Sequence, residues 1–463
     1  MTEVETRIDT EFQKFPLPNS DSSLSKWHLV TVFEDGLRNY LWILTRQVEP
    51  DKVNKELQGF IKFVDRSKYA LRYGLERVRQ KSSASSSVTY PNLSSESYER
   101  ASDILRIGEE YLLACRAFSS YHAGNAEATR NLAGDIIVFT PDTLSNVYSA
   151  INIILEGKQD LESGTPMDAL ASVFLWQDRP EFHVQEIIST TSWHSGRAKY
   201  RFNPFICNRL LVSVPRPPTI VPPQWRFPWG TSADTHRVFE GLYVRCLYHL
   251  IAVHFGASHL KIRGGGVEDI CPLLRKAELI SDIGEVTGMK QEAVSVIVDA
   301  LCYGTKTDTP DPALQPLVPV FEKFLLPPIL ILSSNFPRNF LSLHARVDSR
   351  SFDEQSHLFE AGMSNRIENI LKRLFKYFRM HDFLPQRKNA GEVDVLVADE
   401  SSKTIMVCEL RWLLSPGDPR EVNNRKKVCE EKVLQLRKKV LSAREVIPSI
   451  LASLAVRASQ ADG

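Results

Sequence analysis

Residues 393–412 carry the pattern that most restricts how this chain can fold. Apolar and polar side chains alternate through residues 393–399 and again through residues 404–412, and β-branched residues are enriched in both runs. Alternation with a period of two is typical of strands that bury one face. The four residues between the runs, 400–403, are polar. The pattern therefore predicts a β-hairpin in which residue 399 pairs with residue 404.

This register places the carboxylates of Asp394 and Glu409 opposite each other, with Arg411 on the same face. Side chains directly opposed across a hairpin have Cβ atoms roughly 4.5–5.5 Å apart. Two carboxylates at that separation repel each other unless a cation lies between them or one holds a proton. Their oxygens suit a hard divalent ion such as Mg²⁺. We expect the other face to cover a core, because its side chains are apolar: Val393, Val395, Val397, Met406, Cys408 and Leu410.

Two helical patterns flank the hairpin. Residues 366–378 are amphipathic, with Glu368 near their start, and residues 420–440 form a long basic stretch of helical period. Before the first helix, residues 348–355 are expected to form a polar linker, and after the second helix no clear strand follows. We therefore expect a C-terminal α/β module over residues 348–463.

The order of a helix, a hairpin with an Asp and a Glu-x-basic motif, and a second helix resembles the PD-(D/E)XK, or restriction-endonuclease-like, nuclease superfamily. The resemblance covers residues 362–440. By this resemblance Asp394 corresponds to the motif Asp and Glu409 to the (D/E). Arg411 stands where the family has its Lys.

The resemblance also assigns supporting residues. Glu368, or alternatively Glu360, corresponds to the Glu often found on the upstream helix. Lys432 or Gln435 corresponds to the polar residues of the downstream helix that often support the site.

The function implied by the resemblance is metal-dependent cleavage of DNA. Asp394 and Glu409 would hold Mg²⁺ or Mn²⁺, and Arg411 would contact the scissile phosphate. Arginine is always protonated and presents a planar fork where lysine presents a point charge, so this exchange is not conservative. The alternative is a catalytically lapsed nuclease-like protein that binds DNA or acts as a scaffold. Many nucleases of this kind cut as dimers, so a homodimer is a further alternative. The sequence does not identify the residues of a dimer interface.

Basic residues are concentrated in the two helical patterns. Two basic helices around an acidic centre suit binding to a phosphate backbone, whereas the competing interpretation is an ordinary solvated surface. The net charge is only +1, so any nucleic-acid contact must come from such local patches. The candidate nucleic-acid-binding residues are Lys372, Lys426, Lys427, Lys432 and Gln435.

Length and cysteine content bound the class of protein. A chain of 463 residues is long enough for two to four domains. Its seven cysteines are odd in number and form no Cys-x-x-Cys pair, which favours reduced thiols in a cytoplasmic protein. The first ten residues lack the features of a signal peptide, and the apolar run 324–332 is too short to span a bilayer. We therefore expect a cytoplasmic protein without membrane contact.

The regions before the C-terminal module are expected to be mostly helical. Residues 27–48, 53–78 and 98–121 carry apolar side chains at helical spacing, with a Ser-rich connector at 81–87. This arrangement predicts a helical bundle within an N-terminal domain, residues 1–211, which could bind a protein partner.

A proline-rich segment marks the expected boundary to a central domain, residues 212–347. Its prolines exclude a helix, and Trp225, Phe227 and Trp229 alternate within it. The segment is interpreted as an interdomain strap pinned by aromatic side chains, or alternatively as a surface that stacks on peptides or bases.

Two further patterns in the central domain are interpreted as structural. Residues 278–301 resemble a helix-turn-helix core, but the second helix exposes a mixture of charges rather than the cations that DNA phosphates need. Cys246, His249, His254 and His259 do not all lie on one helix face, so we expect core residues rather than a zinc site.

Overall fold

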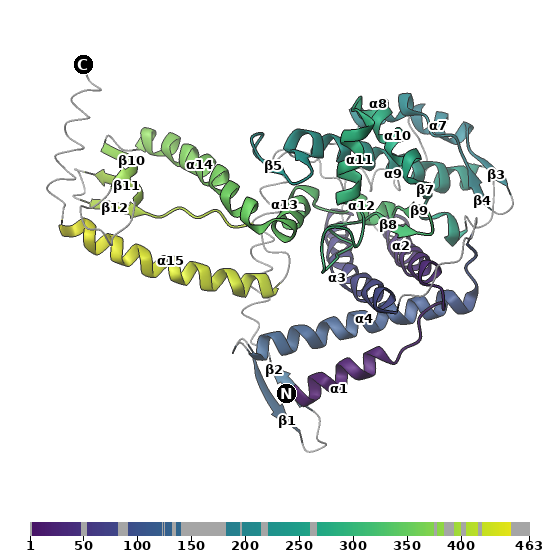
Figure 1. The fold of residues 1–463 in the computed structure, drawn as a ribbon, viewed down its shortest axis with the longest axis horizontal. Helices are drawn as coiled ribbons and strands as arrows, with labels where there is room; N and C mark the ends of the chain where they lie inside the picture. The colour runs from purple at the N-terminus through teal and green to yellow at the C-terminus, as the bar shows by residue number, and fades with distance from the viewer. Residues whose placement is uncertain are drawn as a thin grey trace. The chain divides into compact units, whose positions relative to one another are not determined.

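The computed structural model places most of the chain in helices and small antiparallel sheets (Figure 1). It describes residues 2–47, 53–81, 91–122, 124, 126–131, 136–139, 182–194, 197–213, 221–259, 266–374, 377–383, 393–399, 404–414 and 419–445. The chain divides into compact units, with a boundary between Asp348 and Ser349. We call the described residues before this boundary the N-terminal unit and the described residues after it the C-terminal unit. The expectation of mostly helical N-terminal and central regions is confirmed.

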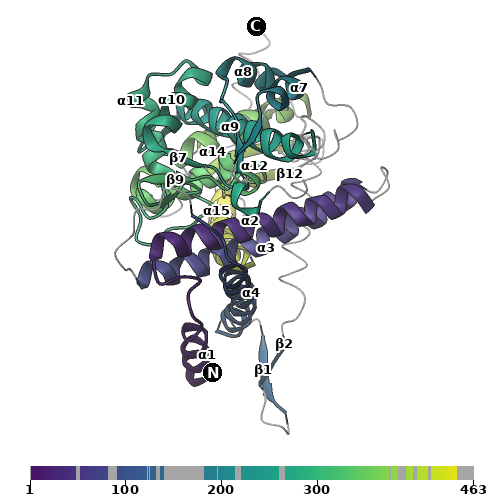
Figure 2. The same cartoon turned by 90° about the vertical axis from the view of Figure 1, so that its right-hand side faces the viewer.

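The N-terminal unit begins with four helices, α1 (Thr2–Gln13), α2 (Ser22–Gln47), α3 (Val53–Gln80) and α4 (Ser95–His122). Helices α2, α3 and α4 pack against one another (Figures 1 and 2). Asp21 caps α2, because its Oδ1 accepts hydrogen bonds from the backbone N–H groups of Ser23 at 2.8 Å and Leu24 at 3.0 Å. Trp27 and Leu41 of α2 are fully buried in this bundle.

The rest of the N-terminal unit surrounds one long helix. Helix α9 (Ser232–His259) packs against five others: α7 (Phe182–Ser189), α8 (Pro204–Ser213), α10 (Lys276–Thr287), α11 (Gln291–Ala300) and α12 (Pro328–Leu332). A 3-10 turn, η3 (Val267–Asp269), and helix α13 (Phe336–Val347) complete the helical elements described here.

Four small antiparallel sheets lie in the described part of this unit. Three are two-stranded: β1 (Glu127–Arg130) with β2 (Ile136–Phe139), β3 (Ser192–His194) with β4 (Arg197–Lys199), and β5 (Arg226–Phe227) with β6 (Gly230–Thr231). The fourth has the order β7-β9-β8, from β7 (Leu273–Arg275), β9 (Lys323–Leu325) and β8 (Val318–Val320).

Helix α2 packs directly against elements from beyond residue 212. Its Glu34 is fully buried and accepts hydrogen bonds from the backbone N–H groups of Ile329 and Leu330, both at 2.8 Å. These bonds join α2 to the start of α12. The boundary expected near residue 212 therefore lies inside one compact unit.

The aromatic residues of the proline-rich segment are buried, as a pinned strap requires. Trp225 is fully buried, and the rings of Phe227 and Trp229 stack with centroids 5.1 Å apart. The indole Nε1 of Trp225 donates a hydrogen bond to Nδ1 of His344, at 3.1 Å, on α13. The described part of the strap is thereby fixed to α13 within a single unit, rather than between two domains.

The expected helix-turn-helix over residues 278–301 is present as α10 and α11. Gly288 follows α10 in the left-handed conformation, with φ of 67°, and its N–H donates to the carbonyl of Gly284. Leu279, Ile283 and Val294 are buried between the helices and the rest of the unit. Cys246 and His249 of α9 are also buried, in agreement with their interpretation as core residues.

The C-terminal unit has the order α14 (Ser349–Leu374), β10 (Tyr377–Phe383), β11 (Val393–Asp399), β12 (Thr404–Cys408) and α15 (Pro419–Glu445). The three strands form an antiparallel sheet in the order β10-β11-β12. Helix α14 contacts β10 and helix α15 contacts β12, at the two edges of the sheet (Figure 1). The predicted hairpin is confirmed with its register, because Asp399 pairs with Thr404.

Three details of this unit differ from the sequence prediction. The linker expected over residues 348–355 is wrong, because residues 349–355 form the first turns of α14, where Arg350 and Glu354 make an i,i+4 ion pair of 2.9 Å. The helix expected to reach residue 378 ends at Leu374. Tyr377 and Phe378, which suit a strand, belong to β10.

The core of the C-terminal unit lies between α14 and the hairpin. Leu371, Val395 and Val397 are buried together, and Ile367, Cys408 and Leu410 pack against them. Met406, which was expected on the same apolar face, is 42% exposed on the edge strand β12. The core face is therefore contributed mainly by β11 and by the end of the hairpin nearest α14.

Candidate functional site

Asp394 and Glu409 both lie at the open end of the β11–β12 hairpin, each next to its last ladder pair. One step beyond the last pair of the ladder, Val395 with Cys408, Asp394 lies level with Glu409. The backbone N–H of Leu410 donates a 2.6 Å hydrogen bond to Oδ2 of Asp394. This bond fixes the orientation of the Asp394 carboxylate beside the residue that follows Glu409.

Two lysines of α15 contact the carboxylate of Glu409. Nζ of Lys439 donates a hydrogen bond to Oε2, and Nζ of Lys432 lies 3.5 Å from Oε1. The lysines are seven residues apart, which places them on the same helix face two turns apart. The side chains of Lys439 and Glu409 are each only 10% exposed. Helix α15 therefore surrounds Glu409 with positive charge in a poorly solvated place.

Arg411 is held from the other helix. Its Nη1 lies 3.1 Å from Oε1 of Glu360 on α14, and the backbone N–H of Trp412 donates to the same oxygen at 3.4 Å. The ring of Trp412 stacks on Phe359 with centroids 4.0 Å apart and planes 7° apart. The segment after β12 is thereby fixed along α14, while the Arg411 side chain stays 46% exposed.

Of the two glutamates considered for the upstream helix, Glu360 is the one that contacts Arg411. Glu368 lies eight residues further along α14, about 80° around its axis, and is half-buried. The side chain of Lys372, the candidate nucleic-acid-binding residue on α14, lies outside the described residues.

The remaining candidates on α15 are exposed, and two of the three lie on other sides of the helix. Measured around the axis from Lys432, Gln435 is about 60° away, Lys426 about 120° and Lys427 about 140°. Lys426 lies 3.9 Å from Glu430 in an i,i+4 pair. Only Gln435 of these three is therefore near the face that carries Lys432 and Lys439.

Asp394 and Glu409 fit a Mg²⁺ ion that takes its remaining ligands from water and from substrate phosphates. Within the described residues, no group of three His, Cys, Asp or Glu side chains could hold a metal. Mg²⁺, however, is commonly bound by one or two carboxylates together with water and substrate phosphates. Asp394 and Glu409 are such a pair, and Leu410 N–H engages only Oδ2 of Asp394.

The formal charges around the pair cancel. Three carboxylates, those of Asp394, Glu409 and Glu360, lie with the cations Arg411, Lys432 and Lys439, so the cluster is neutral. A bound divalent ion would give it a charge of about +2, which favours a phosphate ligand. We call these six residues the carboxylate–lysine cluster.

Lys439 was not identified from the sequence, although a signal for it exists. Lys439 stands seven residues after Lys432, so a helix that presents one to the hairpin presents the other as well. The contact of Glu360 with Arg411 could not be chosen over Glu368 in the same way, because both glutamates precede the hairpin on one helix.

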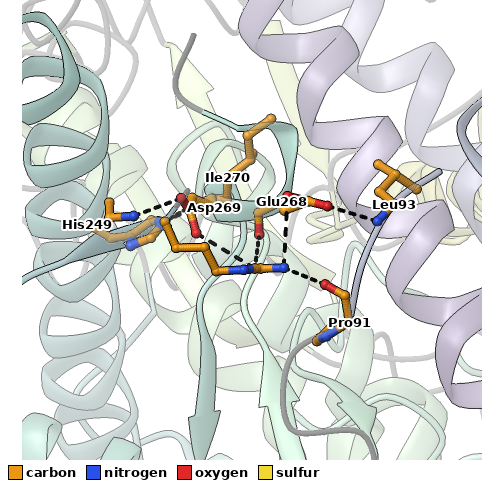
Figure 3. A network of polar contacts seen from close by, with 8 residues as sticks. Pro91, Leu93, His249, Glu268, Asp269 and Ile270 are labelled. Atoms are coloured by element: carbon orange, nitrogen blue, oxygen red, sulfur yellow. Dashed lines mark hydrogen bonds and ion pairs between the residues drawn. The ribbon is translucent and has the colours of Figure 1, made fainter. Parts of the chain in front are cut away.

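A second polar network lies in the N-terminal unit (Figure 3). The guanidinium of Arg197 donates to the carbonyl of Pro91 and lies 3.8 Å from Asp269 and 3.9 Å from Glu268. The Glu268 carboxylate also accepts from the N–H of Leu93 at 2.9 Å. These bonds join β4 to η3 and to the segment before α4.

The same network reaches α9 through a buried histidine. Nε2 of His249 lies 2.8 Å from the carbonyl oxygen of Asp269 (Figure 3). Its Nδ1 lies 2.7 Å from the hydroxyl of Tyr200. Burial lowers the pKa of His249 to about 3, so the ring is neutral. Both ring nitrogens are engaged, and the network is interpreted as a structural connection between elements.

Comparisons with known proteins add no assignment: models of protein families, curated proteins and solved structures each give no match to this chain. Within the part of the chain that the structure describes, no helix combines the length and apolar character needed to cross a membrane.

Proposed function

We propose that the C-terminal unit is a nuclease module of the PD-(D/E)XK type, which hydrolyses phosphodiester bonds of DNA with a divalent metal ion. The observation that carries this proposal is the position of Asp394 and Glu409 at the open end of the hairpin, where Leu410 N–H orients Asp394 and two lysines contact Glu409. The order of a helix, a three-stranded sheet and a basic helix agrees with the resemblance noted in the sequence.

The carboxylates define where the metal would be held. When bound by Asp394 and Glu409, Mg²⁺ or Mn²⁺ would act as a Lewis acid toward water and offset charge on the phosphate. The hydrogen bond from Leu410 N–H orients the Asp394 carboxylate, and Lys439 fixes the rotamer of Glu409. A site that is ordered in this way needs little reorganisation when substrate arrives.

The basic side chains supply the phosphate contacts. Arg411 is almost half exposed, and Glu360 fixes one end of its guanidinium, so its other donors can reach a phosphate oxygen. Lys432, at 32% exposure, lies between Glu409 and solvent. The point charge missing from position 411 is supplied next to Glu409 by the ammonium groups of Lys432 and Lys439.

A second candidate function is DNA binding without hydrolysis. The observation that favours it is the formal neutrality of the six-residue carboxylate–lysine cluster, in which Glu409 already contacts two ammonium groups. A metal ion is then not required to keep Asp394 and Glu409 together.

Cleavage of supercoiled and linear DNA with Mg²⁺ or Mn²⁺ separates the two candidates. Asp394→Asn keeps an acceptor for Leu410 N–H but removes the charge, and we expect cleavage to fall by at least about a hundredfold. Asp353→Asn, at an exposed carboxylate of α14, is the matched control and should cleave like the wild type.

Each result decides between the candidates. DNA binding without cleavage in the wild type would favour the second candidate. Cleavage that is equal in Asp394→Asn and in the control would place the active site elsewhere, and absence of both binding and cleavage would reject both functions.

A further inference from the structure

Helix α15 exposes apolar side chains on the face opposite the carboxylate–lysine cluster. Leu434 is 56% exposed and Leu441 is 60% exposed. They are seven residues apart and therefore lie on one face, two turns from each other. Leu434 lies about 140–160° around the helix from Lys432 and Lys439. The two leucines thus belong to a separate surface of the helix.

Charged residues flank these leucines in an ordered way. Two acidic residues, Glu430 and Glu431, come one turn before Leu434, and two basic residues, Arg437 and Lys438, come one turn after it. All four are exposed, as is Lys427 two turns before Leu434. We call the face made of these residues, Leu434 and Leu441 the outer face of α15. Between residues 430 and 438 its charge changes sign at Leu434, from negative to positive along the chain.

We infer that the outer face of α15 pairs with the same face of a second copy of the chain, in an antiparallel arrangement with the two-fold axis at Leu434. Leu434 then lies against the partner's Leu434, and Leu441 lies along the aliphatic stem of the partner's Lys427. A two-fold axis makes every contact occur twice, so a face whose charge pattern is antisymmetric about its centre is complementary to itself.

The charges match on each flank of such a pair. Glu430 and Arg437 lie on one side of the leucine line, at about 40° and 60° from Leu434, and Glu431 and Lys438 lie on the other side. An antiparallel pair related by the two-fold axis brings Glu430 beside the partner's Arg437. Likewise it brings Glu431 beside the partner's Lys438.

The same residues argue against a parallel pair. Parallel helices in register would place Glu430 beside the partner's Glu431, and Arg437 beside the partner's Lys438. Like charges at such distances oppose association, so the sign change at Leu434 selects the antiparallel arrangement. The intrahelical pair of Lys426 and Glu430, at 3.9 Å between exposed side chains, is too weakly held to prevent this exchange of partners.

The inference does not depend on the proposed nuclease function. Glu409 and its lysines lie on the far side of α15 from the outer face, so both copies would keep that cluster free of the partner. One helix pair is smaller than a standard protein interface of about 1,600 Å². We therefore expect a reversible dimer whose population rises with protein concentration.

Sedimentation equilibrium of the full chain over a wide range of concentration tests the dimer. The wild type should show a monomer–dimer equilibrium, and Leu434→Glu should weaken it by at least about tenfold. Ile370→Glu, which replaces a 51%-exposed apolar residue of α14, is the matched control and should dimerise like the wild type.

Charge reversal tests the antiparallel geometry and does not rely on the leucine variant. Glu430→Lys with Glu431→Lys should weaken the homodimer, and so should Arg437→Glu with Lys438→Glu. A variant with all four changes should regain the wild-type dimer, since its pattern is again complementary to itself. A wild type that stays monomeric would overturn the inference. So would a quadruple variant whose homodimer is as weak as those of the two double variants.

Discussion

Lys439 of α15 donates a hydrogen bond to Glu409 at the end of the hairpin, and both side chains are nearly buried. This contact joins a residue named by the sequence motif to one that the motif does not include. A charge buried with its partner is stable only while the partner remains, so this pair is where the C-terminal unit is most sensitive to substitution.

Removing the lysine should destabilise the C-terminal unit. In Lys439→Met, Glu409 keeps only Lys432, and we expect a loss of roughly 3 kcal/mol, the low end for one partner of a buried pair. Urea denaturation measures this loss. Lys426→Met, at an exposed lysine of the same helix, should change stability by less than about 0.5 kcal/mol. Equal effects of the two substitutions would mean that Lys439 contributes no more than a surface charge.

Restoring lysine to the motif should raise cleavage. Arg411→Lys replaces the planar fork with a point charge that can orient or activate water, and we expect at least about a tenfold gain with Mg²⁺ or Mn²⁺. Glu360→Gln, which keeps an acceptor for the N–H of Trp412, reports on the loss of the Arg411 ion pair alone. If Arg411→Lys binds Mn²⁺ but cleaves no faster, the site is not close to an active geometry.

The buried His344 of α13, to which the strap is bonded, should make the N-terminal unit sensitive to acid. Burial lowers the pKa of His344 from 6.5 to about 4, and its Nδ1 accepts the Trp225 hydrogen bond. Above pH 6.5 the His344 ring is neutral in both the folded and the unfolded protein. As pH falls from 6.5 toward 4, the unfolded chain binds the proton first, so stability is lost over this window.

His344→Gln should reduce this acid sensitivity without abolishing it, because His249 also has a lowered pKa. Thermal unfolding followed across the same pH window measures the difference. A variant that loses stability as steeply as the wild type would mean that His344 does not contribute.

Glu34 should produce the opposite trend with pH. Burial raises its pKa from 4.5 to about 8, although the N–H groups of Ile329 and Leu330 oppose this shift. The folded protein keeps the proton while the unfolded chain releases it, so stability falls as pH rises from 4.5 toward 8. Glu34→Gln should remove this fall. Glu34→Leu should cost about 3 kcal/mol at any pH, because two buried N–H groups lose their acceptor.

Unfolding in urea at several pH values checks both substitutions. Should Glu34→Gln keep the wild-type slope with pH, the carboxyl group would have to be ionised in the folded protein.

Substitution by alanine at two helix glycines should change the stability of the protein in opposite directions. A Cβ at Gly36 of α2 meets no atom within 4 Å, so Gly36→Ala should stabilise the protein by about 1 kcal/mol through helix propensity. A Cβ at Gly108 of α4 would lie 3.0 Å from Cα and 3.1 Å from the carbonyl oxygen of Ala70. Backbone atoms cannot easily yield, so Gly108→Ala should cost roughly 1–3 kcal/mol. Thermal unfolding of both variants measures the two signs, and a gain in both would mean that α3 and α4 separate easily.

The parts of the structure that the sequence predicted are those with local causes. The alternation over residues 393–412 fixes the hairpin register, and the register alone brings Asp394 level with Glu409. The end of α10 at Gly288 and the apolar periods of α10 and α11 likewise have local causes.

The parts that the sequence did not predict depend on packing between distant segments. Which residues of a helix face a hairpin depends on the rotation of the helix about its axis, so Glu360 could not be chosen over Glu368 beforehand. Strand β10 was missed because only its pairing with β11 distinguishes it from a continuation of α14. Met406 was expected to be buried because it is apolar, but it is exposed because it lies on the edge strand β12.

The protonated state of Glu34 changes how the charge of the folded protein should be counted. The formal net charge of +1 treats every carboxylate as ionised. Glu34, with a pKa near 8, holds its proton at neutral pH, so folding removes one negative charge from that sum. The native protein should therefore focus at a higher isoelectric point than the urea-unfolded chain, whose sequence value is about 7.6.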